Sequence, residues 1–152
     1  MKRIASEVAH LVRRFFLSLS RRPPSQVDTT WARNNLLDRE FVLWSQMSNQ
    51  DRRHSIMVAR RFVEEGPDGL RDHVAAALLH DIGKIEAGLG VMGRVAATVL
   101  GPRGRKFRLY HDHEQIGVRL CREHGSTEET LRVLDWSLDD PIVVSLRRAD
   151  QI

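Results

Sequence analysis

The sequence predicts an all-α protein, a compact bundle of about seven or eight helices. Over most of the 152 residues, apolar side chains recur three or four positions apart, which is the spacing of one helix face. No stretch of useful length alternates between apolar and polar residues as a half-buried strand would. Glycine, proline and capping residues divide the periodic stretches into segments of helix length.

Length and composition indicate one globular body in a reducing compartment. The chain is long enough to bury a core, and 41% hydrophobic with 29% charged residues is typical of folded proteins. No apolar run reaches the roughly 18 residues that suggest a transmembrane helix. The single cysteine, Cys121, cannot form an intrachain disulfide, so we expect a cytoplasmic location.

The net charge of +4 is concentrated at the start of the chain. Residues 1–22 hold six of the 24 basic residues but only one of the 20 acidic residues, so the remainder is nearly neutral. A protein that binds duplex nucleic acid needs a basic face for the phosphates. We therefore expect no duplex nucleic acid as a partner.

Residues 1–22 predict an amphipathic, basic helix of about four turns, which the prolines after Arg22 end. Arg13 and Arg14 lie beside its apolar stripe. We expect the stripe to pack against protein, either the helical body or a second copy, with Phe15 and Phe16 largely buried. Contact with an anionic membrane surface is the alternative. The stripe consists of Ile4, Val8, Leu11, Val12, Phe15, Phe16 and Leu19.

The main helical domain is expected over residues 36–152. Residues 23–35 begin with a stretch rich in Pro, Ser and Thr, and we interpret them as a linker. Apolar residues at helical spacing over residues 36–47 then predict the first helix of the domain. The next helix carries His54, and Ser48 with Asp51 resembles its N-cap and first-turn acid.

A buried helix is expected to start at Pro67 or Asp68 and to end on the polar pair His80-Asp81, with Gly83 as its stop signal. His73 lies about two turns before His80, or roughly 10 Å along the helix. Because that separation is too long for one ion, we interpret His73 as structural or solvent-facing.

Residues 91–110 contain no acidic residue and predict a helix followed by a basic loop. We interpret the loop, with Arg105 and Lys106, as solvated. The alternative is a lip over a site, where Arg105 and Lys106 would attract phosphate groups.

Three further helices complete the predicted bundle. Asp112 can cap the first of them, with Gln115 completing a capping box, and Gly125 ends it. Ser126 is expected to open the next helix. Asp140-Pro141 is expected to open the last one, as N-cap and first helical residue.

The adjacent polar residues His80 and Asp81 follow a strongly apolar run, so both are expected in the interior. A buried imidazole and carboxylate cost free energy unless they are paired or bound. A divalent metal ion would satisfy both groups, and it needs further ligands. His54 on an earlier helix and Asp150 on the last helix are the candidates.

These residues carry a resemblance to a known family. His54, His80-Asp81 and Asp150 occur in the order of the H…HD…D pattern, and the surrounding words RHSIMVA, LLHDIGK and HEQIG match as well. The chain from about residue 36 to residue 152 therefore resembles the HD-domain metal-dependent phosphohydrolases. The resemblance implies an HD-type helical bundle with His54, His80, Asp81 and Asp150 as metal ligands.

Two imidazoles and two carboxylates without a thiolate favour Mn, Fe, Co, Ni or Zn over Mg. Such an ion can polarise a phosphoryl oxygen and lower the pKa of bound water from 15.7 to about 7. The resemblance implies that Lys84 binds a substrate phosphate, although its position also suits a lysine at a helix end. It further implies that His113 is an outer histidine, either a second-metal ligand or a general acid.

Residues 134–140 contain no histidine, whereas many relatives in the family carry one before the last helix. We therefore expect one divalent ion rather than two. The predicted function is hydrolysis of a phosphoester, a nucleotide or a related small phosphorylated molecule, by metal-activated water. Asp81, Lys84 and His113 are the predicted catalytic residues. The alternative is a catalytically degenerate regulatory module that binds a nucleotide or a metal.

Overall fold

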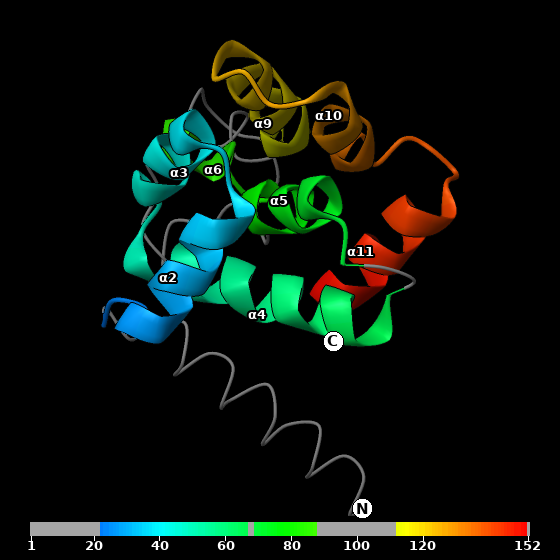
Figure 1. The fold of residues 1–152 in the computed structure, drawn as a ribbon. Helices are drawn as coiled ribbons and strands as arrows, with labels where there is room; N and C mark the ends of the chain where they lie inside the picture. Colours follow the sequence, from blue (N-terminus) through cyan, green and yellow to red (C-terminus); the bar gives the residue numbers. More distant parts are fainter. Residues whose placement is uncertain (1–21, 67–68, 88–111, 152) are drawn as a thin grey trace, which may run out of the picture.

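The computed structural model describes residues 22–66, 69–87 and 112–151 (Figure 1). These residues form helices and no strand, so the all-α prediction is confirmed. None of the described helices has both the length and the apolar character that crossing a bilayer requires. The helices are α2 (Gln26–Asn35), α3 (Asp38–Ser45), α4 (Asn49–Glu65), α5 (Arg71–Leu79), α6 (Lys84–Ala87), α9 (His113–Glu123), α10 (Glu128–Leu134) and α11 (Pro141–Gln151).

Helix α5 is the centre of the fold. It packs against α4, α10 and α2, and Figure 1 shows it between α4 and α10. A helix that is apolar on all sides belongs in a protein interior, and the run Val74–Leu79 is almost completely buried. The polar residues that follow this run are therefore carried into the interior as well.

Helices α4 and α11 pack against each other and begin at the predicted caps. The side chain of Ser48 accepts a hydrogen bond from the backbone N–H of Asp51 at 3.1 Å. At the start of α11, Asp140 Oδ1 accepts a hydrogen bond from the backbone N–H of Ile142 at 2.8 Å, and Pro141 is the first helical residue. Both caps are as predicted from the sequence.

The predicted linker over residues 23–35 is wrong, because Gln26–Asn35 forms α2. Ser25 caps this helix by accepting from the backbone N–H of Asp28 at 3.0 Å. Arg60 of α4 then pairs with Asp28 at 2.8 Å and lies over the Trp31 ring at 4.6 Å. These contacts with α4 stabilise a helix that its polar composition alone does not indicate. The helical body thus begins before residue 36.

Some predicted helix boundaries need smaller corrections. Helix α5 begins at Arg71 rather than at residue 67 or 68, both of which lie outside the described residues. Helix α10 is capped by Thr127, whose hydroxyl accepts from Thr130 N, instead of by Ser126.

Asp112 occupies the N-cap position of α9, but its side chain makes no capping hydrogen bond, so the predicted capping box is not formed. Gly125 ends α9 as predicted, and its positive φ of 76° explains the glycine. The predicted N-terminal helix (residues 1–22) and the helix and basic loop of residues 91–110 lie outside the described residues, apart from Arg22.

Candidate metal centre

Three helical segments far apart in the sequence bring the predicted ligands together. His54 comes from the second turn of α4, His80-Asp81 follows the last turn of α5, and Asp150 lies near the end of α11. His54 Nε2 is 2.9 Å from Asp150 Oδ1, and His80 Nε2 is 3.3 Å from the same oxygen. Both imidazoles therefore converge on one oxygen of Asp150, whereas the group of ligand atoms close enough to share one ion comprises His54, His80 and Asp81 without Asp150.

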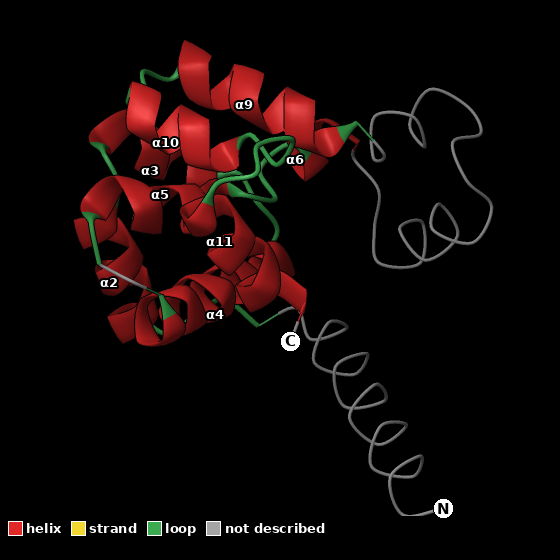
Figure 2. Cartoon of the chain, turned by 90° about the vertical axis from the view of Figure 1, so that its right-hand side faces the viewer, coloured by secondary structure: helices red, strands yellow, loops and turns green. Residues whose placement is uncertain are grey.

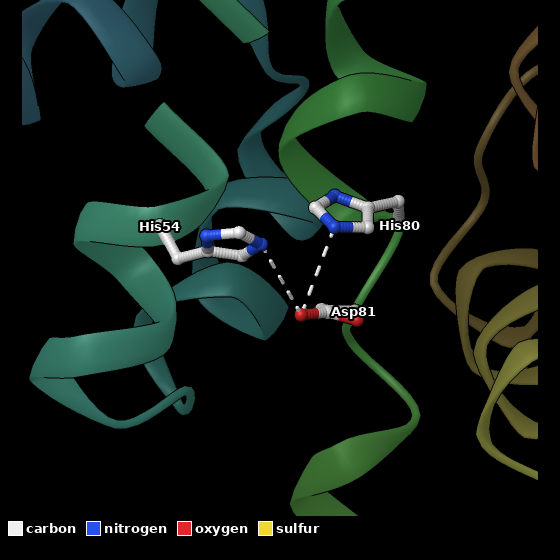
Figure 3. Close-up of side chains that lie close together, drawn as sticks. All are labelled: His54, His80 and Asp81. Carbon is white, nitrogen blue, oxygen red and sulfur yellow. Dashed lines mark ion pairs between the residues drawn. The ribbon is translucent and has the colours of Figure 1, made fainter. Parts of the chain in front are cut away.

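His54, His80 and Asp81 form a group that could hold a metal ion, because one ligand atom from each lies within 4.8 Å of the others. Figure 3 shows both imidazoles directed at one oxygen of Asp81. That oxygen, Oδ2, is 3.6 Å from His80 Nε2 and 4.0 Å from His54 Nε2. If these atoms moved slightly closer around an ion, their distances from the ion could reach those of ordinary metal sites.

The His80 imidazole is fixed by the helix that precedes it. Its Nδ1 donates a hydrogen bond to the Ala77 carbonyl at 2.8 Å. In the neutral ring this bond leaves a lone pair on Nε2, the atom that faces Asp81 and Asp150. Nε2 is buried and has no hydrogen-bond partner. A buried polar atom of this kind requires an explanation, and a metal ion bound between His54, His80 and Asp81 would supply one.

The charges of the site reinforce one another. Burial lowers the pKa of His80, but the carboxylates of Asp81 and Asp150 outweigh it and raise the pKa above its ordinary value. Burial opposes ionisation of Asp81, whereas His80, Lys84 and His54 hold its pKa well below the usual range. Asp150 is only partly buried, which also opposes its ionisation, and His54 and His80 hold its pKa low. Two carboxylates are thus kept ionised where a cation would bind.

Lys84 and His113 approach Asp81 from the two sides of its carboxylate. Lys84 Nζ donates to Asp81 Oδ2 at 2.5 Å, the oxygen that also faces the two histidines. His113 Nε2 lies 3.6 Å from Asp81 Oδ1. Both residues are partly exposed, so each can meet a molecule that enters from solvent. The structure therefore places the two predicted catalytic partners beside the candidate ligands.

Gly83 allows α9 to come close enough to position His113. A Cβ atom at Gly83 would lie 1.8 Å from the His113 carbonyl oxygen and 2.9 Å from Gly117 N. Gly83 has no positive φ and lies beyond the end of α5, so the predicted stop-signal role is wrong. The sequence signal that remains is a glycine two positions after the second of two adjacent predicted ligands. Helix α6, which follows Gly83, lies beside α9 (Figure 2).

Trp136 is a further residue of the site, which was not singled out in the sequence analysis. It lies between α10 and α11, and its ring is parallel to that of His80 within 3°, with centroids 6.1 Å apart. This is the geometry of an offset aromatic stack. No sequence pattern connects Trp136 with His80, because the contact depends on how the two helices pack.

Other candidate residues do not join the site. His73 is buried and bound to Glu129 at 2.6 Å, so it is structural and not solvent-facing. His124 Nδ1 donates to the Leu120 carbonyl within its own helix. Burial, with the charge of Glu40, raises the pKa of Cys121 to about 12, so no thiolate is available. Arg105 and Lys106 lie outside the described residues.

A comparison of the chain with models of known families finds no match, and comparisons with curated proteins and with solved structures find none either. The resemblance to the HD-domain phosphohydrolases rests on the motif residues alone and stays a prediction.

Proposed function

We propose that the protein is a metal-dependent hydrolase of a phosphoester, with one divalent ion held by His54, His80, Asp81 and Asp150. The observation that carries the proposal is the buried Nε2 of His80, which meets no hydrogen-bond geometry yet lies near His54 and within 3.3 and 3.6 Å of two carboxylates. The donor set of two imidazoles and two carboxylates fits Mn, Fe, Co, Ni or Zn better than Mg. The order of these residues in an HD-type pattern supports the same reaction class.

When bound, such an ion supplies a Lewis acid for a phosphoryl oxygen and an activated water. The protein's own residues supply the rest of the chemistry. The Lys84 ammonium is close enough to the ligands to neutralise a second phosphoryl oxygen, once it moves away from Asp81 Oδ2. His113 is held beside the other Asp81 oxygen, where a protonated imidazole can donate a proton to the leaving oxygen.

The substrate we propose is a small phosphorylated molecule, a nucleotide or a relative, acted on in the cytoplasm. A phosphomonoester and a phosphodiester both fit the reaction, since each presents oxygens to a metal and to an ammonium group. Arg105 and Lys106 remain candidates for binding further phosphate groups. The absence of histidine from residues 134–140 supports one ion. Asp135, a carboxylate in that segment, accepts a hydrogen bond from the Ser137 hydroxyl at 2.6 Å.

The test is a panel of phosphomonoesters and phosphodiesters, including nucleotides, incubated with chelator-treated full-length protein and added Mn or Co. We expect turnover that needs the metal and that falls at least about 100-fold in His80→Asn, since even residues behind a ligand are worth 10–100-fold. His124→Asn is the matched control, because His124 is partly buried and hydrogen-bonded only within α9 by its Nδ1 contact. Circular dichroism checks that both variants remain folded.

Two outcomes would contradict hydrolysis in different ways. Turnover that is equal in His80→Asn and wild type would show that the proposed metal centre is not the site of the reaction. Metal binding and nucleotide binding without any turnover would instead support the alternative, a degenerate regulatory module of the same architecture.

A further inference from the structure

Trp136 lies in a short connection that is tied at both ends. On one side, Asp135 Oδ1 accepts hydrogen bonds from the backbone N–H and the hydroxyl of Ser137, at 3.1 and 2.6 Å. On the other side, Asp140 caps α11 and pairs with Arg132 at 2.6 Å. The connection therefore has a defined conformation, and the indole is held in place by more than its own packing.

The indole lies against the buried imidazole of His80. His80 has a single hydrogen bond, from Nδ1 to the Ala77 carbonyl, and this bond alone does not fix the plane of the ring. A parallel indole at 6.1 Å between centroids restricts rotation out of that plane. Together the two contacts hold Nε2 toward Asp150, 3.3 Å away.

We propose that Trp136 is a positioning residue, which holds the His80 imidazole in the orientation that metal binding requires. This inference rests on the proposed metal centre but concerns a residue outside the predicted ligand set. Leucine and phenylalanine both leave part of the indole's volume empty, and only phenylalanine keeps a flat ring. A stacking side chain requires a flat ring, so phenylalanine should preserve the role and leucine should not.

The first experiment measures the Co(II) dissociation constant of full-length protein by calorimetry. Outer groups that orient a metal-bound histidine change metal affinity by 10–100-fold, and a stack is at the weak end of that range. We expect Trp136→Leu to weaken binding about 10-fold and Trp136→Phe to stay within about 3-fold of wild type. Trp31→Leu is the matched control, since Trp31 is also partly buried but stacks under Arg60, and it should leave the affinity unchanged.

The second experiment needs no metal. An indole over one face of an imidazole shifts the carbon-bound ring protons of that imidazole, which NMR spectra of the histidine side chains resolve. The His80 signals are assigned among the seven histidines by their loss in His80→Asn. We expect Trp136→Leu to move these signals, Trp136→Phe to move them less, and Trp31→Leu to leave them in place.

The two experiments separate failure of this inference from failure of the metal centre. If wild type and Trp136→Leu bind Co(II) with equal affinity, the proposed role of Trp136 is wrong and the proposed metal centre stands. If wild type does not bind Co(II), the proposed metal centre is wrong, and so is the proposed effect of Trp136 on metal affinity. In that case the spectra still test whether the indole lies against the His80 ring in solution, and unchanged His80 signals in Trp136→Leu would overturn the stack itself.

Discussion

Two buried histidines, His73 in helix α5 and His80 at its C-cap, have different surroundings. His73 Nε2 contacts Glu129 at 2.6 Å, and Arg132 donates to both oxygens of the same carboxylate. His80 Nε2 instead has two carboxylates and a second imidazole around it but no hydrogen bond. Burial alone therefore does not distinguish a functional histidine from a structural one. The distinction comes from whether the polar atoms already have partners.

The most severe disruption is expected from Gly83→Ala, at the His80 end of the helix. The new methyl group would collide with the backbone of α9, whose atoms cannot move as a side-chain tip can. We expect a loss of about 3 kcal/mol or more in the free energy of unfolding, the upper range for overpacking. Urea denaturation measures it. Gly69→Ala is the control, because its Cβ would meet only Val63 at 4.0 Å, and an equal loss in both variants would refute the close approach.

Metal addition should stabilise the variants of the two histidines to different extents. At a concentration 100 times the dissociation constant, a ligand that binds only the folded state adds about 2.7 kcal/mol to the free energy of unfolding. We expect this gain with Mn or Co in wild type and in His73→Asn, and almost none in His80→Asn. Thermal and urea denaturation with and without metal provide the measurement. An undiminished gain in His80→Asn would show that the metal binds elsewhere.

Without metal, both variants should be less stable than wild type. His73→Asn removes a buried partner of Glu129, so we expect a loss of about 1 kcal/mol in the free energy of unfolding. His80→Asn removes the Nδ1 hydrogen bond to the Ala77 carbonyl, the stack with Trp136 and the imidazole beside two carboxylates, so its cost should be at least as large. Equal denaturation midpoints in wild type and His73→Asn would mean that the His73–Glu129 contact contributes nothing.

The smallest expected effect is the pH dependence of the free energy of unfolding that comes from Glu129, the partner of His73. Hydrogen bonds from Arg132 and His73 lower the pKa of Glu129 from 4.5 to about 2. A carboxyl group whose pKa is lower in the folded state stabilises the fold above pH 4.5, and this contribution is lost as the pH falls toward 2.

Because 41% of the Glu129 side chain is exposed, the contribution should stay below about 1 kcal/mol. The measurement is the free energy of unfolding between pH 6 and pH 3 in wild type and in Glu129→Gln. The decline should be shallower in the variant, and parallel curves would contradict the assignment.

The parts of the fold that the sequence predicted correctly depend on local chemistry. Ser48 and Asp140 cap helices through bonds to residues two or three positions away, so their roles are visible in the sequence. Likewise, polar residues after an apolar run indicated that His80 and Asp81 lie inside the protein. Helix α2 was missed because its stability depends on Arg60, which is 32 positions from Asp28.

The candidate site shows the same division. The ligand types and their order were readable, but the role of Gly83 depends on the backbone of α9 and that of Trp136 on the packing of α5. Neither contact follows from periodicity or propensity, because each joins segments that only the folded chain brings together. Sequence reasoning thus indicated which atoms could bind a metal, and the structure shows what orients them.

The contact between His54 and Asp150 joins residues 96 positions apart in the chain. Closing a loop of that length carries a large entropic cost, and contacts of high sequence separation slow folding. We expect α11 to dock after the transition state, when α4 and α5 have already packed. An ion that needs Asp150 can then bind only the completed fold. It would slow unfolding and leave the rate of folding almost unchanged, so metal would act on the lifetime of the native state rather than on its formation.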